Sequence, residues 1–111
     1  MDTINWQDFE KIQILTGTVV RVKEFPEARK PAWILYIDLG PMGVKKSSAQ
    51  ITTHYTKEDL VGKQVVCVTN FPPKQIGKIT SEVLVTGFPD ENGDVVLCIP
   101  DKPVPNGAKI F

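Results

Sequence analysis

The dominant pattern along the chain is a succession of extended segments rich in Val, Ile and Thr. Alternating apolar and polar side chains, or short apolar runs between turn residues, are typical of β-strands. Within the first segment, Gly17 stands where a strand would bend sharply or bulge. The pattern predicts five strands, and then a hairpin-type turn that leads to a further strand. The strands occupy residues 12–25, 32–40, 45–52, 63–70 and 81–87, the turn 90–94 and the last strand 95–99.

The second predicted strand is apolar on both faces. Trp33, Leu35 and Ile37 alternate on one side, while Ile34 and Tyr36 lie on the other. A strand with one solvated face normally carries polar residues on that face. The sequence therefore predicts that this strand is covered on both sides.

Two short segments have the features of helices. Asn5 is placed to cap a helix that has Asp8 at its third position, and Trp6 and Phe9 would share one face of it. Residues 56–62 begin with a threonine cap, continue with acidic residues and end on a glycine. A helix as short as the first needs another surface to lie on.

The order of these elements predicts the fold class. Three strands, a short helix and then two or more strands, with an early glycine bend, is the order of a five-stranded oligonucleotide/oligosaccharide-binding (OB) barrel. The number of strands alone would also fit an SH3-like barrel or a small sandwich. We expect an all-β barrel with short helices in a single domain, residues 1–111.

Composition and charge limit the function classes. Apolar residues make up 41% of the 111 and charged residues 23%, as in a globular domain, and no apolar run reaches the ~18 residues of a membrane span. The N-terminus lacks the basic and apolar regions of a secretory signal, so we expect a cytoplasmic protein without membrane insertion. Thirteen basic and thirteen acidic residues balance, and any nucleic-acid site must be a local patch.

The sequence offers little for catalysis or for binding a metal. His54 is the only histidine, and no serine lies in a nucleophile-elbow pattern. Cys67 and Cys98 lie inside apolar runs, which predicts buried free thiols rather than a disulfide or a catalytic thiol. These cysteines and His54 have no recognised ligand spacing, and no phosphate-binding glycine fingerprint is present. We therefore expect no enzyme activity, no cofactor and no metal.

A binding function has better candidates. Basic residues occur locally in pairs next to predicted loops or strand ends, where the loops of a barrel can converge on one rim. The alternative is that they are ordinary solubilising charges. The pairs are Arg29 and Lys30, Lys45 and Lys46, and Lys74 and Lys78.

The segment 70–82 joins two strongly apolar strands through an unusual connection. Its two prolines end the preceding strand and stiffen the loop, which lowers the entropy lost on binding, and Asn70 can turn its amide onto nearby backbone. The lysines of this segment could bind phosphate groups, and the Phe71 ring could stack on a base. The Glu82 carboxylate would repel phosphate, so we expect it to accept a hydrogen bond from a base edge, a ribose hydroxyl or a basic peptide side chain. The candidate binding residues here are Asn70, Phe71, Pro73, Lys74, Lys78, Ser81 and Glu82.

A resemblance rests on these residues. Asn-x-x-Pro-Lys at 70–74, followed by Ser81-Glu82, preceded by VGKQVVCV and ending in a PVPNG tail, resembles the tRNA-binding domain family of OB barrels. That family includes domains appended to methionyl- and phenylalanyl-tRNA synthetases. The segments FPEARKPA, SSAQIT, NFPP, SEVLV and PDKPVPNGAKI resemble one subfamily, free-standing bacterial chaperones with a role in protein export. The resemblance covers residues 9–110, nearly the whole chain.

The resemblance implies partners and a site. It implies tRNA as a ligand, and unfolded or signal-bearing polypeptides and export machinery as further partners. The binding rim would also include Lys45, Lys46, Ser47, Ser48 and Gln50. The resemblance further implies a homodimer joined by segments outside the barrel, through Ile4, Trp6, Phe9, Val104, Pro105, Ile110 and Phe111.

The segment departs from the synthetase-type domains at two places. Val83-Leu84 stands where those domains have Gly-Met, and Gly77 lies one residue early, with Lys78 in its place. The loop path around Gly77 and Lys78 therefore does not follow from the resemblance. Three functions stay open: a tRNA-binding protein with a chaperone role, an export chaperone that binds peptides with no tRNA role, and a structural or assembly domain.

Overall fold

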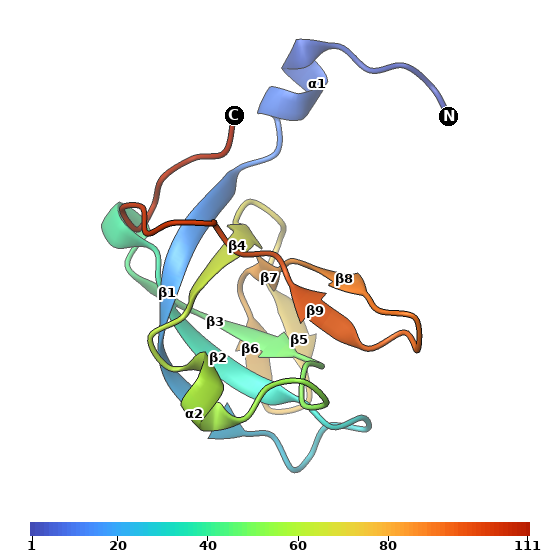
Figure 1. Cartoon of the computed structure of the whole chain (residues 1–111), viewed down its shortest axis with the longest axis vertical. Helices are drawn as coiled ribbons and strands as arrows, with labels where there is room; N and C mark the ends of the chain where they lie inside the picture. Colours follow the sequence, from blue (N-terminus) through green and yellow to red (C-terminus); the bar gives the residue numbers. More distant parts are fainter.

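The computed structural model describes residues 1–111 and contains one five-stranded antiparallel sheet with two small hairpins. The strand order in the sheet is β3-β2-β1-β4-β7 (Figure 1). These strands are β1 (Ile14–Glu24), β2 (Trp33–Asp38), β3 (Val44–Ala49), β4 (Gln64–Val68) and β7 (Leu84–Val85). The hairpins are β5 (Lys74–Ile76) with β6 (Ile79–Ser81), and β8 (Gly87–Pro89) with β9 (Val95–Leu97). The helices are α1 (Trp6–Glu10), α2 (Lys57–Leu60) and the 3₁₀ turn η1 (Gly40–Met42).

The five-stranded sheet curls into a nearly closed barrel. Its edge strand β3 meets the chain just after β6, where the Glu82 N–H donates to the Lys46 carbonyl at 2.8 Å. Fully buried side chains fill the interior, among them Leu35, Ile37 and Leu39. The structure thus confirms the predicted OB-type barrel.

Strand β1 is long because its two halves pair with different neighbouring strands. Residues 14–18 pair with β4, and residues 18–24 pair with β2. The irregularity in the pairing with β2 lies between Val19 and Arg21, three residues beyond the Gly17 position of the predicted bulge. Gly17 instead marks a close approach, since a Cβ there would lie 2.5 Å from a methyl carbon of Ile37.

Strand β2 is covered on both sides, as predicted. Its inner face contributes to the barrel core. On the outer face, Ile34 is only 7% exposed because it packs with Phe25 beneath Ile76 and Ile79 of the β5–β6 hairpin. The hairpin therefore supplies a small second core outside the barrel.

Both predicted helices form with the predicted caps. Asn5 Oδ1 accepts from the Asp8 N–H at 2.9 Å, and the Asp8 carboxylate accepts from the Asn5 N–H. Thr56 caps α2 in the same way, and the rings of Trp6 and Phe9 lie 5.3 Å apart on α1. None of the helices is long and apolar enough to cross a membrane.

Helix α1 buries no residue against the barrel and extends beyond the same end as the C-terminus (Figure 1). The C-terminal tail does pair with the free edge of β1, where the Thr16 N–H donates to the Ala108 carbonyl at 3.0 Å and the Ile110 N–H to the Ile14 carbonyl at 2.9 Å. The Phe111 side chain is nevertheless fully exposed. The chain thus leaves apolar side chains from both termini in solvent.

Both cysteines are free thiols. Cys67 lies in the barrel core, where burial raises the pKa of its thiol to about 12. Cys98 is half-buried, so the prediction of a buried thiol holds fully only for Cys67.

Candidate functional site

The segment 70–82 is a hairpin rather than an irregular loop. Lys74 pairs with Ser81 and Ile76 with Ile79 across a two-residue turn. Gly77, with φ of +59°, takes the first turn position, where a two-residue hairpin favours glycine. Gly77, which lies one residue early compared with the synthetase-type domains, therefore forms the turn of this hairpin. The local sequence Ile-Gly-Lys-Ile, an apolar pair around a glycine turn, is the feature that could have predicted it.

A groove runs along this hairpin on both sides of Lys74. It consists of two cavities, of about 490 and about 810 Å³, which share Ser48, Lys74 and Ile76. We call it the binding groove. One half is mainly apolar, and its other lining residues are Phe71, Pro72, Ser81, Glu82, Val83 and Leu84. The other half is more polar and is completed by Phe25, Glu27, Ala28, Arg29, Lys30, Ala32, Gln50, Gln75 and Gly77.

The structure brings eight of the predicted binding residues together in the groove: Arg29, Lys30, Ser48, Gln50, Phe71, Lys74, Ser81 and Glu82. Other predicted residues do not line it, and these are Lys45, Lys46, Ser47, Asn70, Pro73 and Lys78. Ser47 is 1% exposed because alternation along β3 turns it inward. Lys78 lies in the exposed hairpin turn.

The Asn70 side chain is engaged by backbone far away in the sequence. Its Oδ1 accepts from the Gln13 N–H at 2.9 Å, and its Nδ2 donates to the Lys11 carbonyl at 2.7 Å. The amide thus fixes the chain between α1 and β1 against the end of β4. The expectation that Asn70 turns onto backbone is confirmed, and the backbone it meets is not its own loop.

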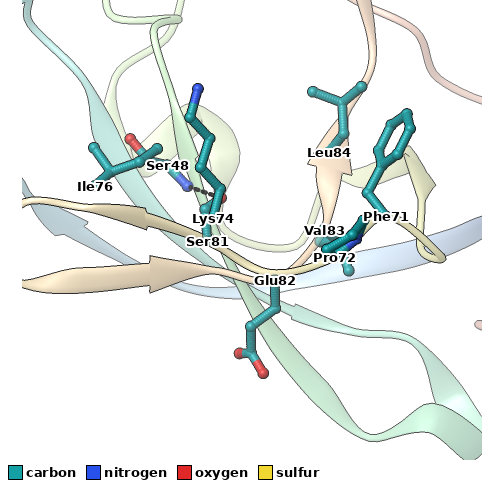
Figure 2. Close-up of a pocket in the computed structure, with 9 residues that line it drawn as sticks. All are labelled: Ser48, Phe71, Pro72, Lys74, Ile76, Ser81, Glu82, Val83 and Leu84. Carbon is teal, nitrogen blue, oxygen red and sulfur yellow. Dashed lines mark hydrogen bonds between the residues drawn. The ribbon is translucent and has the colours of Figure 1, made fainter.

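Ser81 and Glu82 join the hairpin to the edge of β3. Ser81 Oγ accepts from the Ser48 N–H at 3.1 Å, and Glu82 Oε1 accepts from the Lys46 N–H at 3.0 Å. Figure 2 shows the Glu82 carboxylate pointing away from Lys74 and Phe71. One Glu82 oxygen is therefore committed to barrel closure, while the other lies 3.9 Å from Lys45 Nζ.

The groove combines exposed apolar surface with unpaired positive charge. Phe71 and Leu84 are 56% and 50% exposed and stand on the same side as Lys74 (Figure 2). The ion pairs of the molecule are Lys11–Asp8, Lys45–Glu82, His54–Asp90 and Lys57–Glu24. Lys74, Arg29 and Lys30 take part in none of them, so their charges are available to a ligand.

Leu84 and Ile76 were not among the predicted site residues. Leu84 belongs to the predicted strand 81–87, and local alternation does not reveal which of its side chains face out. Ile76 lies in the segment 70–82, which was predicted to be a loop. Their place in the groove depends on the hairpin, which folds back over β2 and β3.

His54 lies away from the groove and pairs with the β8–β9 hairpin. Its Nε2 is 2.7 Å from Asp90 Oδ2, while Asp90 Oδ1 accepts from the backbone of Asn92 and Asp94. The hydrogen bond from His54, and then these backbone bonds, hold the pKa of Asp90 below its ordinary value. This arrangement fastens the turn 90–94 to the segment that precedes α2.

Taken together, the barrel and the groove define a ligand-binding domain of the OB type. Residues 14–109 match the family described as "Putative tRNA binding domain". The match spans most of the chain, and the chain belongs to this family. The family predicted from the sequence is therefore confirmed.

Relatives with this fold include free-standing chaperones and parts of synthetases. The chaperone CsaA from Bacillus anthracis is 51% identical, with a TM-score of 0.93 over 99% of this chain and 100% of that one. CsaA from Picrophilus torridus is 46% identical, with a TM-score of 0.91 over 98% and 100%. The resemblance to free-standing chaperones that the sequence predicted is therefore confirmed. Methionine–tRNA ligase of Nanoarchaeum equitans is 35% identical over 109 residues, which are 96% of this chain but 13% of that protein.

Proposed function

We propose that the protein binds tRNA through the binding groove, in the cytoplasm and without catalysing a reaction. The observation that carries the proposal is Lys74, an unpaired cation between the two halves of the groove, with Arg29 and Lys30 lining the polar half. Such cations bind phosphate, and an exposed ring such as Phe71 can stack on an unpaired base. Membership of the tRNA-binding family supports the same ligand.

The binding should be salt-sensitive because it depends on few charges. The chain as a whole is neutral, so attraction must come from local positive charge such as that of the groove. Each phosphate contact releases counterions, and the logarithm of the affinity falls with the logarithm of the salt concentration by about 0.9 per contact for duplex regions.

The test is titration of labelled tRNA at about 50 and about 200 mM salt. Lys74→Gln should weaken binding severalfold and reduce the salt slope by about 1. Lys102→Gln removes the same charge outside the groove and should bind like the wild type. The absence of saturable binding by the wild type at the lower salt would overturn the proposal.

The proposed assembly is a homodimer joined through the termini. Trp6 on α1 is 58% exposed and has no surface of its own chain to lie on. Near the same end, the C-terminal tail borders a groove of about 360 Å³ lined mainly by apolar residues, including Ile14, Val66 and Ile110. Burial of these side chains in a second copy would remove apolar surface from water, which is the main favourable term in association. A dimer would also double the tRNA contacts.

Sedimentation equilibrium tests this assembly. The wild type should sediment as a dimer, and Trp6→Asp should shift it toward monomer. Gln7→Asp adds the same charge to the same helix at an exposed polar position and should leave the dimer intact. A monomeric wild type at micromolar concentration would rule the dimer out.

A second candidate function is the holding of unfolded or signal-bearing polypeptides for export. It is favoured by the apolar half of the groove, where Phe71 and Leu84 are exposed beside Pro72, and by the likeness to the CsaA chaperones. An extended, partly apolar peptide could lie along these side chains.

A pull-down from lysate, carried out with and without ribonuclease, distinguishes RNA ligands from polypeptide ligands. Polypeptides retained after ribonuclease, and reduced in a Phe71→Ser, Leu84→Ser variant, would favour the chaperone role and its export partners. A denatured client that aggregates equally fast with and without the protein would count against that role.

A further inference from the structure

One histidine and two aspartates from distant parts of the chain meet at the turn of the β8–β9 hairpin. His54 precedes α2, whereas Asp90 follows β8 and Asp94 precedes β9. One nitrogen or oxygen atom from each side chain lies within 4.8 Å of those of the other two. We call these three residues the His54 cluster. No local spacing in the sequence reveals it, because the histidine is 36 residues from the nearer aspartate.

Contacts outside the His54 cluster fix the segment that carries the histidine. The next residue, Tyr55, accepts from Trp33 Nε1 through its carbonyl at 3.0 Å. The Tyr55 hydroxyl accepts from the Leu97 N–H, also at 3.0 Å. The backbone beside His54 is therefore attached to β2 and to β9 without help from the aspartates.

Each carboxylate is oriented through one oxygen, which leaves its other oxygen for a ligand. Asp90 Oδ1 accepts from the N–H groups of Asn92 and Asp94 at 2.8 and 2.9 Å. Its Oδ2 therefore faces His54 Nε2, at 2.7 Å. Asp94 Oδ1 accepts from Thr53 Oγ1 at 3.2 Å. Hydrogen bonds of this kind orient the ligands of metal sites.

The charge and the donor atoms of the His54 cluster suit a divalent transition metal. No lysine or arginine forms an ion pair with Asp90 or Asp94, so with a neutral imidazole the two carboxylates have no cationic partner. A divalent ion would balance both charges. Imidazole nitrogen combined with carboxylate oxygen suits zinc and related ions, whereas calcium and magnesium prefer oxygen ligands.

We propose that the His54 cluster binds one zinc ion through His54 Nε2 and one oxygen each of Asp90 and Asp94, with water as the fourth ligand. Zinc bonds to these atoms are about 2.0–2.2 Å long, so two donors on a tetrahedral ion lie about 3.4 Å apart. The His54–Asp90 distance must then open by about 0.7 Å, and the widest distance must close by at most about 1.4 Å. Small side-chain rotations supply such changes.

The ion would join the β8–β9 hairpin to the segment before α2. This hairpin is a separate two-stranded sheet, an element that has little stability of its own. Zinc should therefore slow amide hydrogen exchange in residues 87–97. The site lies away from the binding groove, so the inference stands whether or not the groove binds tRNA.

The experiment titrates the untagged full chain, freed of metal with EDTA and dialysed, with zinc chloride in a calorimeter. The wild type should bind one ion per chain, and its unfolding midpoint should rise with the zinc concentration. His54→Ala and Asp94→Asn should each bind at least about tenfold more weakly, since loss of even an outer partner of a ligand costs about 10–100-fold. Unfolding midpoints in EDTA establish that each variant is folded.

Two control variants should bind zinc like the wild type. Glu91→Gln removes an exposed carboxylate from the same turn, outside the His54 cluster. Cys98→Ala removes the more accessible of the two thiols, which are the other side chains with a high affinity for zinc.

The imidazole gives a readout that a purely structural role of the cluster would not produce. His54 is the only histidine, so its ring nitrogens are identified without ambiguity in NMR spectra that correlate them with the ring protons. Zinc should shift the Nε2 resonance, and EDTA should reverse the shift. The inference is overturned if the wild type binds no zinc, if Nε2 is unchanged at saturation, or if Cys98→Ala alone abolishes binding.

Discussion

The backbone of Lys46 and the whole of Glu82 are joined by two reciprocal hydrogen bonds. The Glu82 N–H donates to the Lys46 carbonyl at 2.8 Å, and the Glu82 carboxylate accepts from the Lys46 N–H at 3.0 Å. A carboxylate thus occupies the position of a strand partner at the open edge of β3. This pairing closes the barrel where the regular ladder between strands has ended.

Removing the Glu82 carboxylate should loosen this closure. Glu82→Ala leaves the Lys46 N–H without its acceptor, and we expect the free energy of unfolding to fall by about 1.5–3 kcal/mol, as for loss of a hydrogen bond to a charged group. Urea denaturation measures the change.

The matched variant is Glu82→Gln. Its amide oxygen can still accept from the Lys46 N–H, and it loses only the long, half-exposed pair with Lys45, so its unfolding midpoint should stay close to that of the wild type. Equal destabilisation by both substitutions would mean that charge, and not the hydrogen bond, matters at this position.

The Asn70 amide should control the order of the N-terminal segment. Asn70→Ala removes one acceptor and one donor that hold the backbone of residues 11 and 13, which should cost about 1–2 kcal/mol of stability. The loss of order is confined to the N-terminal segment, so limited proteolysis should cut the variant before residue 14 faster than it cuts the wild type.

Asn70→Asp separates the two bonds, because a carboxylate keeps the acceptor for Gln13 and loses the donor for Lys11. Cleavage at an intermediate rate is expected. If Asn70→Ala and the wild type are cut equally fast, the amide does not hold this segment in place.

The pairing of His54 with Asp90 predicts a dependence of stability on acid pH. The pKa of Asp90 is lowered in the folded state, chiefly by the hydrogen bond with His54. Its stabilising contribution is therefore fully present above the ordinary value of 3.8 and is lost as the pH falls below that value through the folded pKa.

A carbon-detected NMR titration of the Asp90 carboxyl measures this shift directly. His54→Ala should raise the pKa of Asp90 toward 3.8, whereas Asp94→Asn keeps the backbone donor and should leave the shift in place. An Asp90 carboxyl that titrates identically in the wild type and in His54→Ala would contradict the assignment of cause.

Local features of the sequence predicted much of the fold and less of the site. The caps at Asn5 and Thr56 were predictable because their partners lie three residues away. The partners of Asn70 and Glu82 lie 59 and 36 residues away, and no local pattern specifies them. The β5–β6 hairpin was missed because prolines and lysines obscured a short apolar pair around Gly77, and the place of Ile76 in the groove was missed with it.

The two thiols should differ sharply in reactivity. Burial raises the pKa of Cys67 to about 12, so at neutral pH its thiol is protonated as well as covered by the core, and the thiolate is the reactive form. We expect a disulfide reagent to titrate one thiol quickly in the folded protein and both after denaturation. Cys98→Ala should abolish the fast reaction, and Cys67→Ala should leave it.

The raised pKa of Cys67 should also make the stability of the fold depend on pH in the alkaline range. The folded state holds the Cys67 proton more tightly than the unfolded state does. The contribution of this thiol to the free energy of unfolding is therefore complete below the ordinary pKa of 9.0 and is lost as the pH rises from there toward about 12. Cys67→Ala removes this dependence, so the difference in unfolding midpoint between the wild type and Cys67→Ala should narrow above pH 9. A difference that stays constant from neutral pH to pH 11, or two thiols that react at one rate in the folded protein, would show that Cys67 is not shielded.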